Sequence, residues 1–185
     1  DMVTLAEGIP VVVETSMKDN FKVTPDQLEA NINKNTKRFI LNSPGNPTGA
    51  VYNKNELNLI SKILIKNPHV QILSDDIYEH IIYNNKFYNI LNVEPKLYER
   101  TFIANGVSKA FSMTGWRIGY GAGNREIIKS ISKIQSQSTT NPCSISQVAA
   151  KHALLGEKEF LSKWIKKFEH RKNVLIEFFS SIKGL

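Results

Sequence analysis

The feature that most constrains the fold is an alternation of short apolar runs with segments of helical periodicity. Three of the apolar runs have the length and composition of buried strands, and they lie at residues 37–41, 70–73 and 101–104. A segment with helical spacing separates the first two runs, and further helical segments follow the third. Strands that alternate with helices form a mostly parallel sheet with helices on both faces. The sequence therefore predicts an α/β domain.

Capping signals mark two of the expected helices. Thr24 and Gln27 flank a proline at the first helical position, which is typical of a helix that starts there. Asn53 and Glu56 form the same kind of signal ahead of a longer apolar stripe. Helical spacing alone predicts three more helices, at residues 125–135, 144–155 and 157 onward.

Three weaker patterns predict additional β-structure. Residues 9–14 form a β-branched run, and residues 116–120 alternate between apolar and polar side chains. Residues 81–88 surround the pair Asn84-Asn85 and favour a small hairpin. We expect strands at the first two places and a hairpin at the third.

Composition narrows the classes of function. The 185 residues, 41% hydrophobic and 22% charged, are typical of one substantial globular domain. No apolar run approaches the roughly 20 residues of a membrane span, so we expect a cytoplasmic protein without a membrane partner. A single cysteine cannot form an internal disulfide, and four separated histidines predict no metal site. The net charge of +7 is spread along the chain, so we expect no nucleic-acid partner.

A polar cluster follows each of the three predicted buried strands. The clusters span residues 42–49, 74–78 and 105–117. Taken singly, the first could be a tight turn, the second a helix cap and the third a solvated surface. Because successive strands of a parallel sheet end at the same edge, we expect the three clusters to converge on one crevice. Their convergence is the argument for a functional site.

The functional groups of these clusters form a complementary set. They are the amide of Asn46, the carboxylate of Asp75, the phenol of Tyr78, the amine of Lys109 and the guanidinium of Arg117. Pyridoxal 5'-phosphate (PLP) needs such a set: an amine for its aldehyde, an acid for its ring nitrogen, donors for its phenolate oxygen and a cation for its phosphate. The clusters therefore predict a PLP site.

Three motifs also carry a resemblance to a known family. They are Asn-Ser-Pro-Gly-Asn-Pro-Thr-Gly from Asn42, Ser-Asp-Asp-Ile-Tyr-Glu from Ser74, and Ser-Lys-Ala-Phe-Ser-Met-Thr-Gly-Trp-Arg-Ile-Gly from Ser108. In order and spacing they resemble those of the class I PLP-dependent aminotransferases, and most closely those of bacterial aspartate aminotransferases. The similarity extends across essentially the whole chain. It implies part of the large domain of a fold type I PLP-dependent transferase.

The resemblance implies a role for each matching residue at the reactive end of the cofactor. Lys109 would bind the cofactor covalently and then move the proton between the substrate's α-carbon and the cofactor. Asp75 would pair with the ring nitrogen. Tyr78 and Asn46 would hydrogen-bond the phenolate oxygen. The family also leads us to expect a cis peptide bond between Asn46 and Pro47.

The resemblance implies further contacts that hold the cofactor in place. Ile77 would pack against one face of the ring, and Ser108 and Arg117 would bind the phosphate. Gly106 stands where many relatives carry a phosphate-binding Ser or Thr. We therefore expect one phosphate contact of the family to be missing.

The family resemblance also implies an activity and an organisation. The expected reaction transfers an amino group from aspartate to 2-oxoglutarate in a homodimer with shared active sites. Residues 1–156 would be part of the PLP-binding large domain, and residues 157–185 a long helix leading toward a small domain. The family's arginine for the substrate α-carboxylate has no counterpart here. We expect residues 1–185 alone to show no appreciable transamination, because that anchor positions the substrate.

Other functions stay open at this stage. A β-eliminating or decarboxylating lyase can use the same fold and cofactor. A transcription regulator with an aminotransferase-like sensing domain would need a DNA-binding module upstream of residue 1. A purely structural fragment without cofactor is a third alternative, and the intact set of cofactor residues argues against it.

Overall fold

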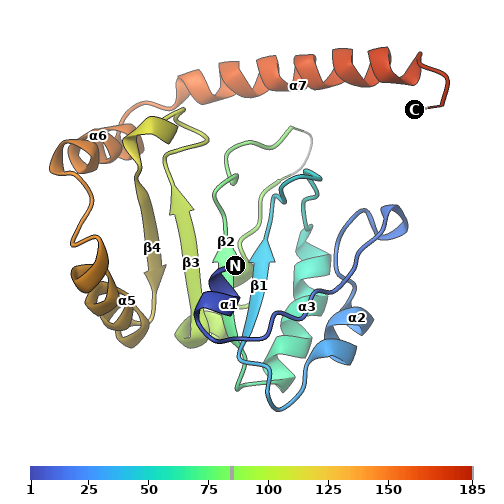
Figure 1. Cartoon of the computed structure of the whole chain (residues 1–185). Helices are drawn as coiled ribbons and strands as arrows, with labels where there is room; N and C mark the ends of the chain where they lie inside the picture. Colours follow the sequence, from blue (N-terminus) through green and yellow to red (C-terminus); the bar gives the residue numbers. More distant parts are fainter. Residues whose placement is uncertain (84–85, 185) are drawn as a thin grey trace.

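A computed structural model describes residues 1–83 and 86–184, and Figure 1 shows its elements. The helices are α1 (Met2–Leu5), α2 (Pro25–Asn31), α3 (Lys54–Lys66), α4 (Ile90–Val93), α5 (Arg125–Ser138), α6 (Ser144–Leu155) and α7 (Glu159–Ser180). The strands are β1 (Arg38–Asn42), β2 (Gln71–Asp75), β3 (Thr101–Gly106) and β4 (Gly119–Gly123). Short 3-10 turns lie at Met17–Asp19, Pro95–Arg100 and Thr114–Trp116.

The strands form one sheet in the order β1-β2-β3-β4. The pairs β1/β2 and β2/β3 are parallel, whereas β4 runs antiparallel to β3. The register places Asn42 opposite Asp75 and Asp75 opposite Ala104. The three parallel strands therefore end at one edge of the sheet, as Figure 1 shows. The mostly parallel α/β sheet predicted from the sequence is confirmed.

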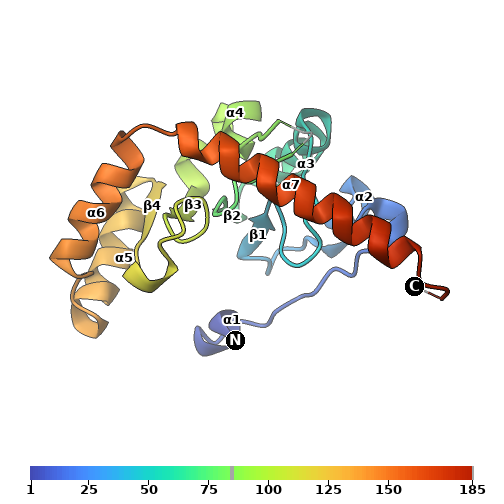
Figure 2. The ribbon, with the colours of Figure 1, turned by 90° about the horizontal axis from the view of Figure 1, so that it is seen from above.

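The larger core lies between the sheet and α3. Leu57, Ile60 and Leu64 form the apolar stripe of this helix, and each is at most 1% exposed. They belong to one buried cluster with Leu41 of β1 and Ile72 of β2. The helices α2, α3 and α4 lie on this side of the sheet, and α1 lies on the other (Figure 2). Each such buried side chain contributes about 1.5–3 kcal/mol, so this layer firmly supports the strand ends.

The ends of α3 are capped by side chains from different parts of the chain. The predicted capping boxes at Thr24 and Asn53 are both present at the starts of α2 and α3. At the other end of α3, the guanidinium of Arg100 donates to the carbonyl oxygens of Leu64 at 2.5 Å and Val70 at 2.6 Å. Because the last carbonyls of a helix have no partners within it, Arg100 joins α3 to the start of β3.

A second core lies beneath the loop that joins β3 to β4. Its buried members come from the loop, α6 and α7, and they are Val107, Ala110, Phe111, Ile118, Ala150 and Leu161. The rings of Phe111 and Phe160 pack with their centroids 6.0 Å apart. Apolar side chains therefore anchor the loop on both sides of Lys109.

Two of the predicted strands need correction. Residues 9–14 form no strand, and the side chains of Ile9 and Val12 are 89% and 81% exposed. A β-branched run favours a strand only where a neighbouring strand and a buried face are available, and this segment pairs with none of the described strands. The strand predicted at residues 116–120 begins only at Gly119. Trp116 ends a 3-10 turn and Arg117 has a φ of 54°, which interrupts the extended chain.

The predicted hairpin and the C-terminal helices have different outcomes. The hairpin turn, Asn84-Asn85, lies outside the described residues, and the described residues on either side of it, 81–83 and 86–88, form no strand, so the strands of the predicted hairpin are not found there. The three C-terminal helices are confirmed, and α7 is a single long helix that crosses the side of the molecule where the parallel strands end (Figures 1 and 2). Lys172 of α7 lies 5.0 Å from the ring centroid of Tyr83. Within residues 1–83 and 86–184, none of the helices has the length and apolar character needed to cross a bilayer.

Candidate functional site

Asn42, the last residue of β1, links the first two polar clusters. Its Oδ1 accepts a hydrogen bond from the backbone N–H of Asn46 at 3.1 Å. Its Nδ2 donates to the backbone carbonyl of Asp75 at 3.2 Å. One side chain thus holds the loop after β1 against the end of β2. The predicted convergence of these two clusters is confirmed.

Tyr78 is the point at which three predicted site residues meet. The side-chain amide of Asn46 donates to the Tyr78 hydroxyl at 3.2 Å. From the third cluster, the ammonium nitrogen of Lys109 lies 5.5 Å from the centroid of the Tyr78 ring. Asn46 and Lys109 are exposed, and Tyr78 is half-buried. An amide, a phenol and an amine therefore lie together where the parallel strands end.

Asp75 and Ile77 lie in the turn that follows β2. Asp75 is half-buried, and its Oδ1 accepts a hydrogen bond from the backbone N–H of Ile77 at 3.2 Å. The side chain of Ile77 lies against Gly106 of β3. A Cβ atom at Gly106 would come within 3.0 Å of both Ile77 Cδ1 and the carbonyl oxygen of Ile118. This close packing explains why position 106 is a glycine rather than the phosphate-binding Ser or Thr that many relatives carry there.

Ser108 and Arg117 lie at opposite ends of the loop between β3 and β4. The hydroxyl of Thr114 donates to the Ser108 carbonyl at 3.1 Å, and Arg117 Nη1 donates to the Thr114 carbonyl at 2.9 Å. These hydrogen bonds, from Thr114 to the Ser108 carbonyl and from the Arg117 side chain to Thr114, run within the loop. Both residues lie on the loop that also carries Lys109, and the Arg117 side chain is exposed.

The loop after β1 contains two cis peptide bonds. The bond between Asn46 and Pro47 is cis, as predicted. The bond between Ser43 and Pro44 is also cis, which the sequence did not indicate.

Sequence reasoning missed a buried hydrogen-bond network beside Asp75. Asp76 is 4% exposed, and its carboxylate accepts hydrogen bonds from the Ser74 hydroxyl at 2.7 Å and from the side-chain amide of Asn89. Burial raises the pKa of Asp76, and the nearby carboxylates of Glu79 and Asp75 act in the same direction, while the two hydrogen bonds oppose it. The adjacent acidic pair was the available signal, but sequence alone could not tell which member is buried.

A second missed contact joins the ends of β2 and β3. The side-chain amide of Asn105 donates to Glu79 Oε1 at 2.8 Å, and His80 Nε2 lies 3.4 Å from the same oxygen. Burial, followed by the charges of Glu79 and Asp76, raises the pKa of Tyr120 on the adjacent strand. These contacts hold the turn after β2 beside the strand that leads to Lys109.

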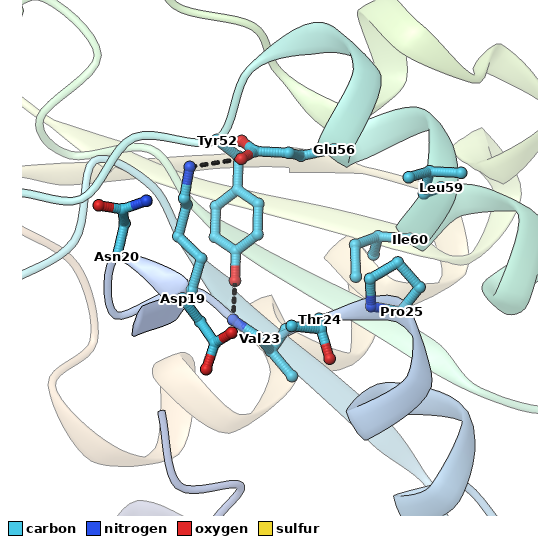
Figure 3. A pocket seen from close by; sticks show the side chains of 10 residues that line it. Asp19, Asn20, Val23, Thr24, Pro25, Tyr52, Glu56, Leu59 and Ile60 are labelled. Carbon is cyan, nitrogen blue, oxygen red and sulfur yellow. Dashed lines mark hydrogen bonds and ion pairs between the residues drawn. The ribbon is translucent and has the colours of Figure 1, made fainter. Parts of the chain in front are cut away.

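A separate hollow lies between α3 and the segment before α2 (Figure 3). It encloses about 270 Å³, and two polar contacts cross it. Lys22 Nζ contacts Glu56 Oε1 at 2.5 Å, and the Tyr52 hydroxyl accepts from the backbone N–H of Val23 at 2.7 Å. These contacts fasten residues 19–25 to α3. The hollow therefore has a structural explanation and lies apart from the convergent strand ends.

The sequence matches a family model along its whole length. The model describes class I and II aminotransferases, and the match covers residues 1–185. This chain belongs to that family. Membership in this family implies PLP as the cofactor.

Curated aminotransferases resemble this one closely. An aspartate/prephenate aminotransferase from Cereibacter sphaeroides is 50% identical over 186 residues, which cover 100% of this chain and 46% of the relative. An aspartate/prephenate aminotransferase from Nitrosomonas europaea is 47% identical and covers 100% of this chain and 47% of the relative. The chain thus spans about half the length of the curated relatives it matches.

Solved aminotransferases share its fold. The aspartate aminotransferase from Rhizobium meliloti superposes with a TM-score of 0.97 at 42% identity, covering 99% of this chain and 46% of that one. The Thermus thermophilus aspartate aminotransferase with maleate superposes with a TM-score of 0.92 at 37% identity, covering 97% of this chain and 47% of that one. An aromatic aminotransferase from Pyrococcus horikoshii superposes with a TM-score of 0.90 at 36% identity, covering 95% of this chain and 47% of that one. The predicted fold, part of the large domain of a fold type I PLP-dependent transferase, is confirmed.

The chemistry of this chain's donor set fits PLP. Asn46, Tyr78 and Lys109 place two hydrogen-bond donors beside an amine. Asp75 supplies a carboxylate at the adjoining strand end, and Arg117 an exposed guanidinium on the lysine's own loop. These are the groups that an aldehyde, a phenolate, a ring nitrogen and a phosphate require.

Proposed function

We propose that these residues form most of the PLP site of an enzyme that transfers an amino group from an amino acid to a 2-oxo acid. The observation that most directly supports the proposal is the meeting of three strand ends at Tyr78, with Asn46 hydrogen-bonded to its hydroxyl and Lys109 over its ring. The same residues occupy the motif positions at which the family binds the reactive part of its cofactor.

Each residue at the reactive end has its own task in this proposal. When bound, PLP supplies an aldehyde that takes up the amino group and a ring that accepts negative charge from the substrate. Lys109 would hold the aldehyde carbon through its amine, with the aldehyde oxygen leaving as water, and once released would carry the proton to and from the substrate α-carbon. Asp75 holds a proton on the ring nitrogen. Tyr78 and Asn46 donate hydrogen bonds to the phenolate oxygen.

Three other residues hold the cofactor in place. Ile77 provides an apolar contact for the ring face. Ser108 and Arg117 bind the phosphate, for which the planar guanidinium can supply two parallel hydrogen bonds. The hydrogen bonds through Thr114 support this task, because they set the conformation of the loop on which both residues lie.

Aspartate is the amino donor in this proposal. Relatives that are 45–50% identical carry aspartate and prephenate in their names, and a similar solved enzyme contains maleate, a dicarboxylate. The acceptor is 2-oxoglutarate, with prephenate as a second candidate because the relatives' names include it. The same names favour a transferase over a lyase or a regulator.

We also propose that the complete protein is a cytoplasmic homodimer with shared active sites, in which residues 1–156 belong to the large domain and residues 157–185 lead to the small one. Exposed apolar side chains on α5 and α6 support an interface: Ile134, Ile145 and Leu155 are 71%, 70% and 76% exposed. Apolar patches of this kind mark surfaces that other chains cover. Light scattering of the complete protein tests the subunit number.

Absorbance spectroscopy with added PLP tests the cofactor assignment. We expect the visible band of a protonated Schiff base in the wild type, its loss in Lys109→Ala, and its retention in the control Lys133→Ala, which changes an exposed lysine of α5. Borohydride reduction and peptide mapping should place the cofactor on Lys109. Labelling scattered over many lysines and unaffected by Lys109→Ala would contradict the assignment.

Product analysis on the complete protein tests the reaction. With aspartate as donor, amino transfer to 2-oxoglutarate and to prephenate is measured in parallel. We expect Lys109→Ala to lower turnover by at least about 100-fold, because a positioned acid–base group contributes that much or more. Release of ammonia or carbon dioxide from aspartate without amino transfer to either 2-oxo acid would identify a lyase instead.

A further inference from the structure

Asp76 is a buried charged side chain that touches none of the groups assigned to the cofactor. It is 4% exposed and stands between Asp75 and Ile77. The Ser74 hydroxyl donates to its Oδ1 at 2.7 Å, and the side-chain amide of Asn89 donates to its Oδ2. Both carboxylate oxygens are therefore held in place.

The orientation of Asn89 is set independently of Asp76. Its Oδ1 accepts a hydrogen bond from the backbone N–H of Leu91 at 2.7 Å in the first turn of α4. Because an amide side chain has one accepting and one donating end, its NH₂ group must then face Asp76. The contact is directional, and it joins the end of β2 to the N-terminus of α4.

The backbone of Asp76 is fixed as well. Its N–H donates to the carbonyl of Ala104 in β3 at 2.9 Å, and its carbonyl accepts from the N–H of Glu79 at 2.8 Å. The residue is thus tied to β3, to α4 and to its own turn. Asp75 and Tyr78 flank this anchor in the sequence.

We propose that Asp76 is a positioning residue whose two side-chain hydrogen bonds set the turn at residues 75–78 so that Asp75 and Tyr78 face PLP. This inference rests on the PLP site proposed above. Asp76 does not touch the cofactor, and it acts through geometry rather than through its charge.

Two substitutions separate geometry from charge. Asp76→Asn can keep both hydrogen bonds, because its oxygen accepts from Asn89 and its NH₂ donates to the Ser74 hydroxyl, which can also accept. Asp76→Ala loses both bonds and leaves the buried Asn89 amide without its partner. Ser74→Ala removes one of the two bonds and keeps the carboxylate. The expected order of cofactor affinity is wild type and Asp76→Asn, then Ser74→Ala, then Asp76→Ala.

PLP titrations of the complete protein measure this order. We expect Asp76→Ala to weaken PLP binding at least about tenfold and Asp76→Asn to stay within about twofold of wild type. The pH at which the cofactor's absorbance band changes should shift in Asp76→Ala, because Asp75 and Tyr78 are displaced, and stay unchanged in Asp76→Asn. A merely structural loss of stability would leave this pH unchanged.

Amide hydrogen exchange in the cofactor-free protein gives a readout that does not need PLP. The N–H of Ile77 is bonded to Asp75, so it should exchange faster in Asp76→Ala and at the wild-type rate in Asp76→Asn. If Asp76→Ala fails to fold, Ser74→Ala is compared with Asp76→Asn in its place, because it also loses one of the two hydrogen bonds. Wild-type affinity and pH response in the variants that lose a bond, or equal losses in Asp76→Asn and Asp76→Ala, would overturn the proposal. A wild type that carries no PLP on Lys109 would overturn the cofactor assignment instead.

Discussion

The two halves of the candidate site are held in different ways. The turn after β2 is fixed by hydrogen bonds to buried polar groups, Asp76 and Asn89. The loop after β3 is fixed from below by apolar anchors such as Phe111, while Lys109 and Arg117 remain exposed. Asp75 and Tyr78, which are assigned to the cofactor ring, therefore lie on a turn that is already held in place by hydrogen bonds. The amine of Lys109 and the guanidinium of Arg117 extend from an exposed part of a loop.

The largest effect should come from removing an anchor beneath the loop. Phe111→Ala deletes a buried ring that packs on Phe160, and we expect it to lower the free energy of unfolding by about 3–5 kcal/mol. Urea unfolding of the complete protein measures the change. The control is Lys163→Ala, an exposed residue of α7 expected to change stability by about 0.5 kcal/mol or less. Similar values for the two variants would mean that apolar packing does not hold the loop.

A smaller effect is expected where the two halves touch. Gly106→Ala adds a methyl group within 3.0 Å of Ile77 Cδ1 and the Ile118 carbonyl, so we expect a loss of about 1–3 kcal/mol and weaker PLP binding. Gly115→Ala is the control, because nothing lies within 4 Å of its added Cβ. If thermal melting and PLP titration show the same behaviour for both variants, the halves are not in tight contact at Gly106.

Removing the hydrogen bond between Thr114 and Ser108 should lower the free energy of unfolding by a smaller amount. Thr114→Val removes the hydroxyl that donates to the Ser108 carbonyl, and we expect a loss of about 0.5–1.5 kcal/mol in urea unfolding. Thr114→Ser keeps the hydroxyl and should stay near wild type. Because Thr114 is exposed, a loss larger than that of Ser74→Ala would contradict the contrast between the two halves.

The smallest expected effect is a pH dependence that comes from the β2 side alone. Burial raises the pKa of Asp76 above that of an unfolded aspartate, with Glu79 and Asp75 adding to the shift. The native state therefore holds this proton more tightly. The stabilisation is complete below the unfolded pKa of about 3.9 and is lost as pH rises through the folded pKa.

Comparison with Asp76→Asn isolates this contribution. As pH rises above about 4, the unfolding free energy of wild type should fall relative to that of Asp76→Asn. Chemical denaturation at several pH values measures it. A difference that is constant, or that moves in favour of wild type with rising pH, would contradict the stated direction for Asp76.

The parts of the fold that follow from local pattern could be predicted from the sequence. The capping boxes at Thr24 and Asn53 need only neighbouring residues, and both are present. The three parallel strands follow from compact apolar runs, and their convergence follows from the way parallel strands share an edge. The same reasoning predicts that Asn46, Tyr78 and Lys109 lie together, and the contacts of Tyr78 with the other two confirm it.

The remaining features depend on partners far along the chain. Residues 9–14 have a strand's composition but no neighbouring strand among the described elements. The buried carboxyl of Asp76 is paired with Asn89, and neither residue's local sequence carries that information. Tertiary contacts decide both of these features.

The antiparallel pairing of β4 with β3 has a consequence for how such sites can diversify. Residues 107–118 leave the sheet at Gly106 and rejoin it at Gly119, which is paired with Gly106. A segment closed between two paired positions can be exchanged for another without changing the register of any strand. Lys109 and Arg117 therefore belong to one exchangeable segment. Replacing residues 107–118 by the corresponding segment of a relative would exchange the amine and the phosphate-binding cation in a single step.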